Sequence, residues 1–192
     1  MSNKIELPKE RVIHFNQQVE QGSIGNVVRQ ILEINQADRA LEKNAELAGF
    51  KYVAPPIKLY INSYGGSVYQ ARGLTDVMNS SVTPIHTIAV GAAMSCGFFI
   101  LVHGHKRFMY PNAGVMYHQI SSFAWGELKK MEEDMKQSKR MYKMFRDAIM
   151  ERTSLTKKQL KNIYKSKKDW HLTAEECLAF NVVDEIIEPI KR

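Results

Sequence analysis

Residues 57–102, IKLYINSYGGSVYQARGLTDVMNSSVTPIHTIAVGAAMSCGFFILV, decide the fold. IKLYIN (57–62) predicts a strand, SYGG breaks it, and helical periodicity then runs over 67–78. IHTIAV (85–90) is a continuous apolar run, typical of a strand buried on both faces, and GAAMSCGFFILV (91–102) starts a buried helix. Strands that alternate with helices favour parallel pairing through crossover connections, so this stretch predicts an α/β fold.

The flanking sequence continues the pattern. SIGNVVRQILEI (23–34) predicts a helix with Ser23 as its N-cap. Segment 35–56 is polar and Ala-rich and ends in Pro55-Pro56, so we predict a surface insertion there with one short helix. Four further short strands are predicted: RVIHF (11–15), RFMY (107–110), GVMYH (114–118) and VVDEII (182–187).

A long helix is predicted over 126–152. Its apolar seam repeats at alternating spacings of three and four residues, which favours packing against another helix. The seam consists of Leu128, Met131, Met135, Ser138, Tyr142, Phe145 and Ile149. Two capping boxes, Thr156 with Gln159 and Thr173 with Glu176, predict two further helices, and Asn181 suits the left-handed end of the last one.

Length and composition indicate one domain over 1–192 with a real core. No apolar run approaches the about 18–20 residues that span a bilayer, and the start of the chain lacks the apolar region of a signal peptide. Cys96 and Cys177 have no metal-type spacing and are expected to be free thiols in a cytoplasmic protein. The net charge of +7 raises a nucleic-acid hypothesis, but the lysines of 157–168 are more typical of a solvated helix face.

Three features are candidates for chemistry, each with a plainer interpretation. Ser95 stands at the predicted start of a helix, where unpaired N–H groups favour an anion, but it also suits close packing. Gly65-Gly66 can aim an N–H at a reacting carbonyl or form an ordinary tight turn. His118 ends a predicted strand and can face a site or be a surface or core histidine.

A nucleophilic serine needs a base, and the base needs an orienting acid. Asp169 precedes a helix N-cap and is a candidate for that acid, but composition and spacing do not separate it from Asp147 or Asp184. His103 and His105 suggest a metal pair, although a turn between helix and strand is the simpler interpretation, and we predict no metal site.

Five stretches of the chain resemble the proteolytic subunit of the Clp ATP-dependent protease, the ClpP family. The resemblance runs from about Arg11 to Ile187, and the order and separation of the stretches fit together. The matching stretches are RVIHFNQQV, LYINSYGGSV, GAAMSCGFFIL, KRFMYPNAGVMYHQ and KDWHLTAEECLAFNVVDEII. The resemblance implies the ClpP/crotonase-like fold of repeated β-β-α units, with 126–152 as a long handle helix.

The resemblance also implies site residues. Ser95 falls on the family's nucleophile, His118 on its general base and Asp169 on its orienting carboxylate. The N–H groups of Gly66 and Cys96 fall on the oxyanion hole. The family binds its substrate as an added strand, which implies substrate contacts at the following positions. They are Gly65, Ser67, Val68, Ile120 and Ser121.

The partners implied are a second ring of the same subunit, an AAA+ unfoldase such as ClpX or ClpA, and unfolded proteins or peptides as substrates. In the family two seven-membered rings stack into a chamber. ATP is used by the unfoldase, and no cofactor is expected on this chain; neither a membrane nor a nucleic acid is an expected partner.

Several positions depart from the family pattern. Tyr64 and Ile120 stand where the family usually has proline, and Trp170 where many relatives have an arginine that links ring assembly to activity. Lys58 replaces a common aromatic residue of the ATPase-docking surface, and 35–56 is longer than the family's connection. These departures bear on ring size and ATPase partnership rather than on the triad, and they suggest a divergent member such as a phage-encoded one.

Three alternative hypotheses stay open. A stand-alone ClpP-like peptidase, as in phage head maturation or signal-peptide degradation, would use the same triad without an unfoldase. A non-catalytic ring subunit would lack a triad member, but all three are present. A nucleic-acid-binding protein would bind tightly and lose affinity steeply with salt.

Overall fold

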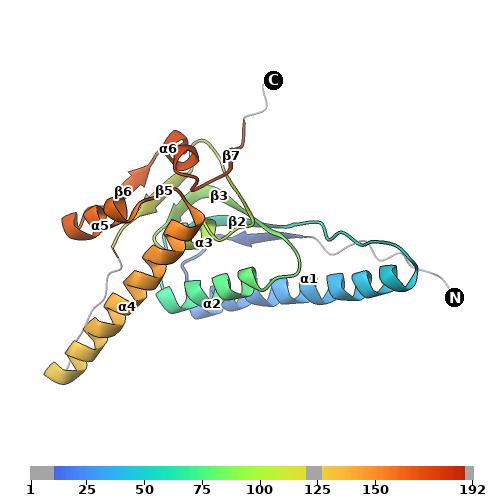
Figure 1. Cartoon of the computed structure of the whole chain (residues 1–192), viewed down its shortest axis with the longest axis horizontal. Coiled ribbons are helices and arrows are strands. Elements are labelled where there is room, and N and C mark those ends of the chain that lie inside the picture. Colours follow the sequence, from blue (N-terminus) through green and yellow to red (C-terminus); the bar gives the residue numbers. More distant parts are fainter. Residues whose placement is uncertain (1–10, 120–126, 189–192) are drawn as a thin grey trace.

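The computed structural model describes residues 11–119 and 127–188, and the following elements lie within them (Figure 1). The strands are β1 (Val12–Phe15), β2 (Ile57–Ser63), β3 (Ile85–Met94), β4 (Lys106–Met109), β5 (Gly114–Tyr117), β6 (Trp170–Leu172) and β7 (Glu185–Ile186). The helices are α1 (Gln21–Leu47), α2 (Val68–Asn79), α3 (Cys96–Leu101), α4 (Leu128–Arg152), α5 (Lys157–Ser166) and α6 (Ala174–Ala179). This mixed α/β order, with a parallel sheet, confirms the predicted fold class.

The sheet is built around β3. Its main path runs β1-β2-β3-β4-β7, and every pair along that path is parallel. The first half of β3 pairs with β4 and its last three residues, Ala92–Met94, pair with β5. Strand β3 therefore carries the chain past the edge of β4 and delivers Ser95 beside the end of β5.

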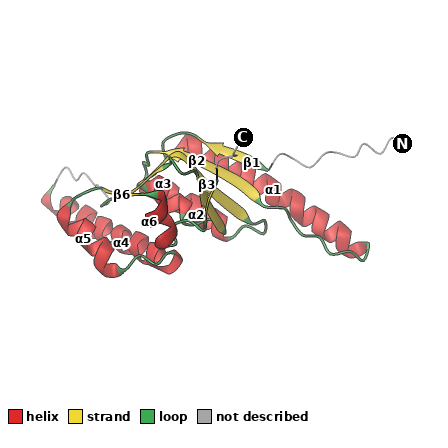
Figure 2. Cartoon of the chain, turned by 90° about the horizontal axis from the view of Figure 1, so that it is seen from above, coloured by secondary structure: helices red, strands yellow, loops and turns green. Residues whose placement is uncertain are grey.

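Helices α1 and α2 cover one face of this sheet and lie side by side (Figure 1). Strand β2 alternates accordingly, with Ile57, Leu59 and Ile61 fully buried and Lys58 exposed. Helices α4 and α5 pack together at one end of the molecule, opposite the far end of α1 (Figure 2). No helix in the described ranges is long and apolar enough to cross a membrane.

Helix α1 is longer than the sequence pattern predicts. It runs without a break through Leu47, so the predicted surface insertion is the second half of this helix followed by an extended return to β2. In the second half of the helix, residues 35–47, most residues are Ala, Leu, Glu, Lys or Arg, which are strong helix formers, so polarity alone was a poor guide to where the helix ends. The predicted N-cap is also wrong, because Glu20 is the N-cap and Ser23 is the third helical residue, whose Oγ accepts from the N–H of Glu20.

A buried carboxylate ties this extension to the body of the protein. Asp38 is 2% exposed, forms an ion pair with Arg11 and accepts hydrogen bonds from the hydroxyls of Thr83 and Tyr52. Arg11 also donates to the carbonyl of Pro55. We call this group the Asp38 clamp; it joins β1, α1, the return segment and the start of β3.

Two boundaries in the centre and at the end of the chain also differ from prediction. Residues 91–94 continue β3, so the helix is only Cys96–Leu101, because these small residues pair with β5 instead of turning. Strand β6 was not predicted. It is three residues long and forms by pairing antiparallel with the distant β5, so its own sequence carries too short a pattern to predict a strand. Both capping boxes and the left-handed Asn181, with φ 52°, are confirmed.

Candidate active site

Ser95 occupies a sharp turn between β3 and α3. Its backbone has φ 53° and ψ −116°, a conformation that residues other than glycine rarely adopt. The N–H of Ser95 donates to the carbonyl of Met116 in β5, at 2.9 Å, which fixes the turn from the neighbouring strand. Such strain costs about 1–3 kcal/mol and persists where the surrounding structure enforces it, often at sites that do chemistry.

Two glycines after β2 hold the chain close to this turn. Gly65 has φ 106°, and a Cβ there would lie 2.7 Å from the Cβ of Ser95. Gly66 has φ 145°, and a Cβ there would lie 2.5 Å from the carbonyl oxygen of Val19. Both positions therefore require glycine, for the backbone conformation and for the lack of space.

Strand-like bonds to Val19 orient the second glycine. The N–H of Val19 donates to the carbonyl of Gly65 at 2.8 Å, and the N–H of Ser67 donates to the carbonyl of Val19 at 2.7 Å. This bridge uses no polar group of Gly66 itself, whose carbonyl accepts a 3.2 Å hydrogen bond from the Cys96 thiol. Burial raises the pKa of that thiol to about 11, so Cys96 stays protonated and unreactive near neutral pH.

Ser95, His118 and Asp169 lie in one line. The Nε2 atom of His118 is 2.8 Å from the Oγ of Ser95, and its Nδ1 atom is 3.5 Å from a carboxylate oxygen of Asp169. The first distance is a hydrogen bond, whereas the second is an ion-pair distance longer than a normal hydrogen bond. The side chain of His118 is 28% exposed and that of Asp169 is 56% exposed, so the acid end of the line is open to solvent.

The antiparallel register of β5 and β6 explains how the acid reaches the histidine. Tyr117 pairs with Trp170, and the next residues outward on the two strands are His118 and Asp169. The other two candidate acids have different partners, because Asp147 forms an ion pair with Arg146 and Asp184 with Arg107.

A small pocket opens beside Ser95. Its volume is about 50 Å³, and aromatic rings supply much of its wall. It is lined by Gly66, Val68, Ser95, Cys96, Phe98, Phe99, Tyr117, His118, Tyr142, Phe145 and Ile149. The rings of Phe99 and Phe145 stack with centroids 3.8 Å apart. An apolar side chain of a substrate would be accommodated here, next to the hydroxyl of Ser95.

The remaining predicted contact residues have four different outcomes. Val68 lines the pocket, whereas the hydroxyl of Ser67 accepts from the N–H of Gln70 and caps α2. Gly65 lies against Ser95 without lining the pocket. Ile120 and Ser121 lie outside the described residues.

The sequence analysis missed the aromatic wall. Phe145 was recognised only as a member of the helical seam, and Phe99 only as part of an apolar helix. The spacing of the seam predicted that Tyr142 and Phe145 lie on the packed side of the helix, but it did not predict which residues they pack against.

The paired histidines of the α3–β4 turn have structural partners. The Nδ1 atom of His103 is 2.7 Å from the carbonyl oxygen of Phe99, and that of His105 accepts from the N–H of Ile85. Within residues 11–119 and 127–188, no three His, Cys, Asp or Glu side chains are grouped so that they could hold a metal ion.

Comparison with known proteins shows the family of the chain. The family model described as Clp protease matches residues 2–190. The chain belongs to the Clp protease family. It is also 28% identical over 184 residues to a protein of Deinococcus radiodurans named ATP-dependent Clp protease proteolytic subunit, covering 95% of this chain and 82% of that relative. Membership of the Clp protease family makes the chain a peptidase, a hydrolase of peptide bonds.

Proposed function

We propose that this chain is a serine endopeptidase in which Ser95 is the nucleophile, His118 the general base and Asp169 the orienting acid. The observation that supports this best is the 2.8 Å contact between the Oγ of Ser95 and the Nε2 of His118. A serine hydroxyl is a weak nucleophile unless a base takes its proton, and this geometry supplies the base. The strained turn at Ser95 gives further support, because it presents the hydroxyl at the end of a strand.

The reaction has two acyl-transfer steps. The Oγ of Ser95 attacks the carbonyl carbon of the peptide while its proton passes to the Nε2 of His118. The tetrahedral intermediate then expels the amine, which takes that proton from His118. A water molecule next attacks the acyl-enzyme with His118 again as base, which releases the acid and restores Ser95. Asp169 favours the tautomer of His118 with its proton on Nδ1 and stabilises the imidazolium.

The N–H groups of Gly66 and Cys96 are the proposed donors to the oxyanion. The N–H of Gly66 takes no part in the bridge to Val19, and Cys96 is the first residue of α3, where an N–H has no intrahelical acceptor. Loss of one such donor in other enzymes costs about 3–4 kcal/mol of transition-state stabilisation.

The proposed substrates are unfolded proteins or peptides bound in extended form. An extended chain that pairs beside Ser67 and Val68 would place one side chain in the aromatic pocket next to Ser95. Family membership supports a ring assembly with an AAA+ unfoldase that uses the ATP, and we propose both for this chain. In this scheme no cofactor is bound by the chain itself.

The test is intact-mass analysis after incubation with a fluorophosphonate, which labels activated serines. We expect one adduct on the wild type and none on Ser95→Ala. Ser80→Ala, which removes an exposed hydroxyl at the end of α2, is the matched control and should keep the adduct. Equal labelling of the wild type and Ser95→Ala, or equal peptide hydrolysis by both, would contradict the proposal.

A separate experiment addresses the unfoldase. A chamber fed by an unfoldase should degrade a short peptide alone but a folded protein only when the unfoldase and ATP are added. A stand-alone peptidase would show no gain from the unfoldase with either substrate.

A further inference from the structure

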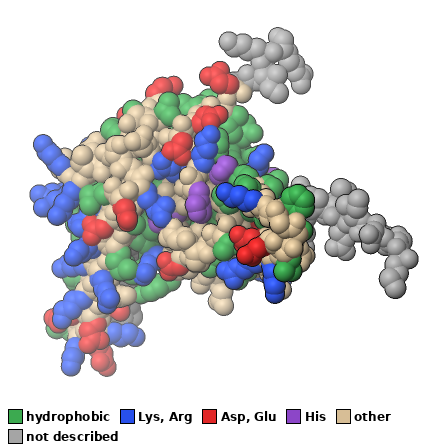
Figure 3. Space-filling model, turned by 45° about the vertical axis from the view of Figure 1, so that its right-hand side comes forward, with side chains coloured by type: hydrophobic (Ala, Val, Ile, Leu, Met, Phe, Trp, Pro, Cys, Tyr) green, Lys and Arg blue, Asp and Glu red, His purple; other side chains and the backbone are tan. Residues whose placement is uncertain are grey.

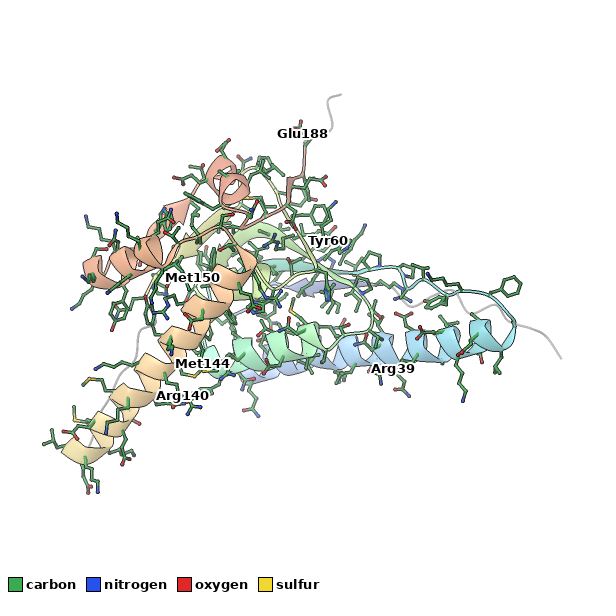
Figure 4. All side chains as sticks on the ribbon, in the orientation of Figure 1. Arg39, Tyr60, Arg140, Met144, Met150 and Glu188 are labelled. Atoms are coloured by element: carbon green, nitrogen blue, oxygen red, sulfur yellow. The ribbon has the colours of Figure 1, made fainter. Side chains whose placement is uncertain are left out.

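A second cavity lies behind the pocket beside Ser95. It has a volume of about 170 Å³ and lies between α2 and α4, where α4 passes α2 near Met144 (Figure 4). Its walls are more polar than those of the first pocket and include Arg72, Asp76, Glu151 and Arg152. The mechanism proposed above does not use this space.

Only two side chains line both spaces. Phe99 and Phe145 belong to the wall of the first pocket and to the wall of the second. Their rings lie 3.8 Å apart with an angle of 19° between their planes, so the two stacked rings form a partition between the cavities.

The partition is supported on its far side by His103. Its ring lies 4.2 Å from that of Phe99, and its Nδ1 atom is 2.7 Å from the carbonyl oxygen of Phe99. Burial lowers the pKa of His103 to about 4, so the ring is neutral near pH 7 and Nδ1 can donate to that carbonyl as a neutral N–H. Phe145 is 6% exposed, so neither ring of the pair has a free path into solvent.

The polar groups beyond the partition differ in how they are paired. Arg152 donates to the side chain of Asn79 at 2.6 Å, and Arg72 contacts the sulfur of Met141. The carboxylates of Asp76 and Glu151 have no hydrogen-bond or ion-pair partner among the residues that the structure describes. A side chain that reached this space would therefore meet free acceptors for a hydroxyl proton.

We propose that the Phe99–Phe145 pair sets the depth of the specificity pocket and thereby limits which residue can precede the cleaved bond. This inference rests on the proposed serine peptidase function. With the pair closed, the pocket accepts side chains of about leucine size. With the pair opened, the two cavities join and accept an aromatic side chain, with tyrosine favoured over phenylalanine because its hydroxyl reaches Asp76 and Glu151.

The experiment compares three peptides that differ only in having leucine, phenylalanine or tyrosine before the same fluorogenic leaving group. Phe145→Ala and Phe145→Leu open the partition from α4, and Phe99→Leu opens it from α3. Phe108→Leu is the matched control, because Phe108 lies in β4 and lines neither space. We expect each opening variant to raise the tyrosine-to-leucine ratio of kcat/KM at least tenfold, and Phe108→Leu to leave that ratio within about threefold.

Two further comparisons make the result specific. Adding Asp76→Ala and Glu151→Ala to an opening variant removes both acceptors, and should lower the rate for tyrosine and leave the rate for phenylalanine unchanged. Fluorophosphonate labelling of each variant shows whether Ser95 is still activated, and it does not depend on the size of the pocket. A variant that is not labelled has lost its folded active site and is left out, and the result then rests on the labelled variants.

The outcomes separate the two claims. The inference about the Phe99–Phe145 pair alone is overturned if the wild type is labelled and active and the labelled variants keep its tyrosine-to-leucine ratio of kcat/KM. Loss of labelling in all three opening variants also overturns it, because the pair would then be needed to hold Ser95 in place. A wild type that is neither labelled nor active overturns the proposed function and this inference with it.

Discussion

A close approach of Gly65 to Ser95 helps to fix the position of the proposed nucleophile. Gly65 lies so near Ser95 that a Cβ would come within 2.7 Å of the Cβ of Ser95 and 3.1 Å of the N of Cys96. Neither neighbour can give way easily, because the turn at Ser95 is already strained and is bonded to β5. The position of Ser95 therefore depends on residue 65 being glycine, which has no Cβ.

We expect Gly65→Ala to lower kcat/KM by at least a hundredfold, because the added Cβ displaces Ser95 and the adjacent N–H from their positions. Gly73→Ala is the matched control, since Gly73 lies on the exposed face of α2 with nothing within 4 Å of an added Cβ. Peptide hydrolysis measures the effect. Equal activity of Gly65→Ala and Gly73→Ala would show that the close approach does not position Ser95.

Asp169 lies more loosely against the histidine than a buried triad acid does. Its side chain is 56% exposed and 3.5 Å from His118, so solvent screens part of its interaction with the ring. We expect Asp169→Asn to reduce kcat/KM about tenfold to a hundredfold, less than the about 10⁴-fold loss known for a buried aspartate. Asp147→Asn, which alters the alternative acid, should stay within about twofold, and a fully active Asp169→Asn would exclude the proposed acid.

At the scale of elements, the Asp38 clamp holds the long helix α1 in place. Beyond it the helix and the return segment extend away from the sheet, and three of their apolar side chains, Leu47, Phe50 and Val53, are 73–80% exposed (Figure 1). The position of this extension therefore depends on the Asp38 clamp, and not on packing of the exposed side chains at its far end. Asn35 also holds the helix at this point, because its side-chain oxygen accepts a hydrogen bond from the N–H of Thr83.

We expect Asp38→Asn to lower the free energy of unfolding by about 3 kcal/mol, because it leaves the half-buried guanidinium of Arg11 without its carboxylate. Urea unfolding followed by circular dichroism measures the change. Asp134→Asn, an exposed position on α4, should change the free energy by less than about 0.5 kcal/mol. A similar, small effect of both substitutions would show that the clamp contributes little.

The same clamp predicts how stability depends on acid. Burial raises the pKa of Asp38, but the hydrogen bonds from Arg11, Thr83 and Tyr52 outweigh this and leave it at about 2, against an ordinary value of 3.8. A lowered pKa means that the folded state binds the proton less tightly than the unfolded chain. The contribution of about 2 kcal/mol is therefore present above pH 4 and is lost as the pH falls toward 2. Asp38→Asn should remove this part of the acid dependence in urea titrations repeated between pH 2 and 5.

At the scale of the whole molecule, α4 leaves part of its seam exposed. Phe145 and Ile149 are buried, whereas Leu128 is 75% exposed and Met135 is 54% exposed on the part of the helix that projects from the body (Figures 1 and 4). Unpartnered apolar positions in a regular seam favour helix packing between subunits.

We therefore expect a species larger than the 22.0 kDa chain in native mass spectrometry, and a shift toward smaller species when Leu128 and Met135 are both changed to glutamate. Lys136→Glu adds an acidic group at the next position, outside the seam, and should leave the assembly intact. An assembly unaffected by the double substitution would place the contact elsewhere.

Lys and Arg side chains gather along one side of the molecule in Figure 3. All six lysines of 157–168 are exposed. Four of them lie on α5 and two follow its last residue, so the predicted solvated helix face extends just beyond the helix.

The sequence by itself determined the order of the elements and most of their local chemistry. Capping boxes at Thr156 and Thr173, the left-handed Asn181 and the apolar run of β3 depend on neighbours a few residues away, so they are visible in the pattern. Ser95 was visible at the predicted start of a helix, and His118 and the two glycines at the ends of predicted strands. The resemblance to the ClpP family assigned roles to them.

Only the tertiary structure shows that Asp169, of the three candidate acids, lies beside His118, and only the folded chain forms the pocket. Asp169 comes next to His118 through the register of β5 and β6, whose partners are more than fifty residues apart in the sequence. The partition likewise joins a residue of α3 to one of α4. Pairings of this kind depend on packing between distant segments, which local propensity and periodicity do not encode. For the same reason the Asp38 clamp appeared only in the folded chain.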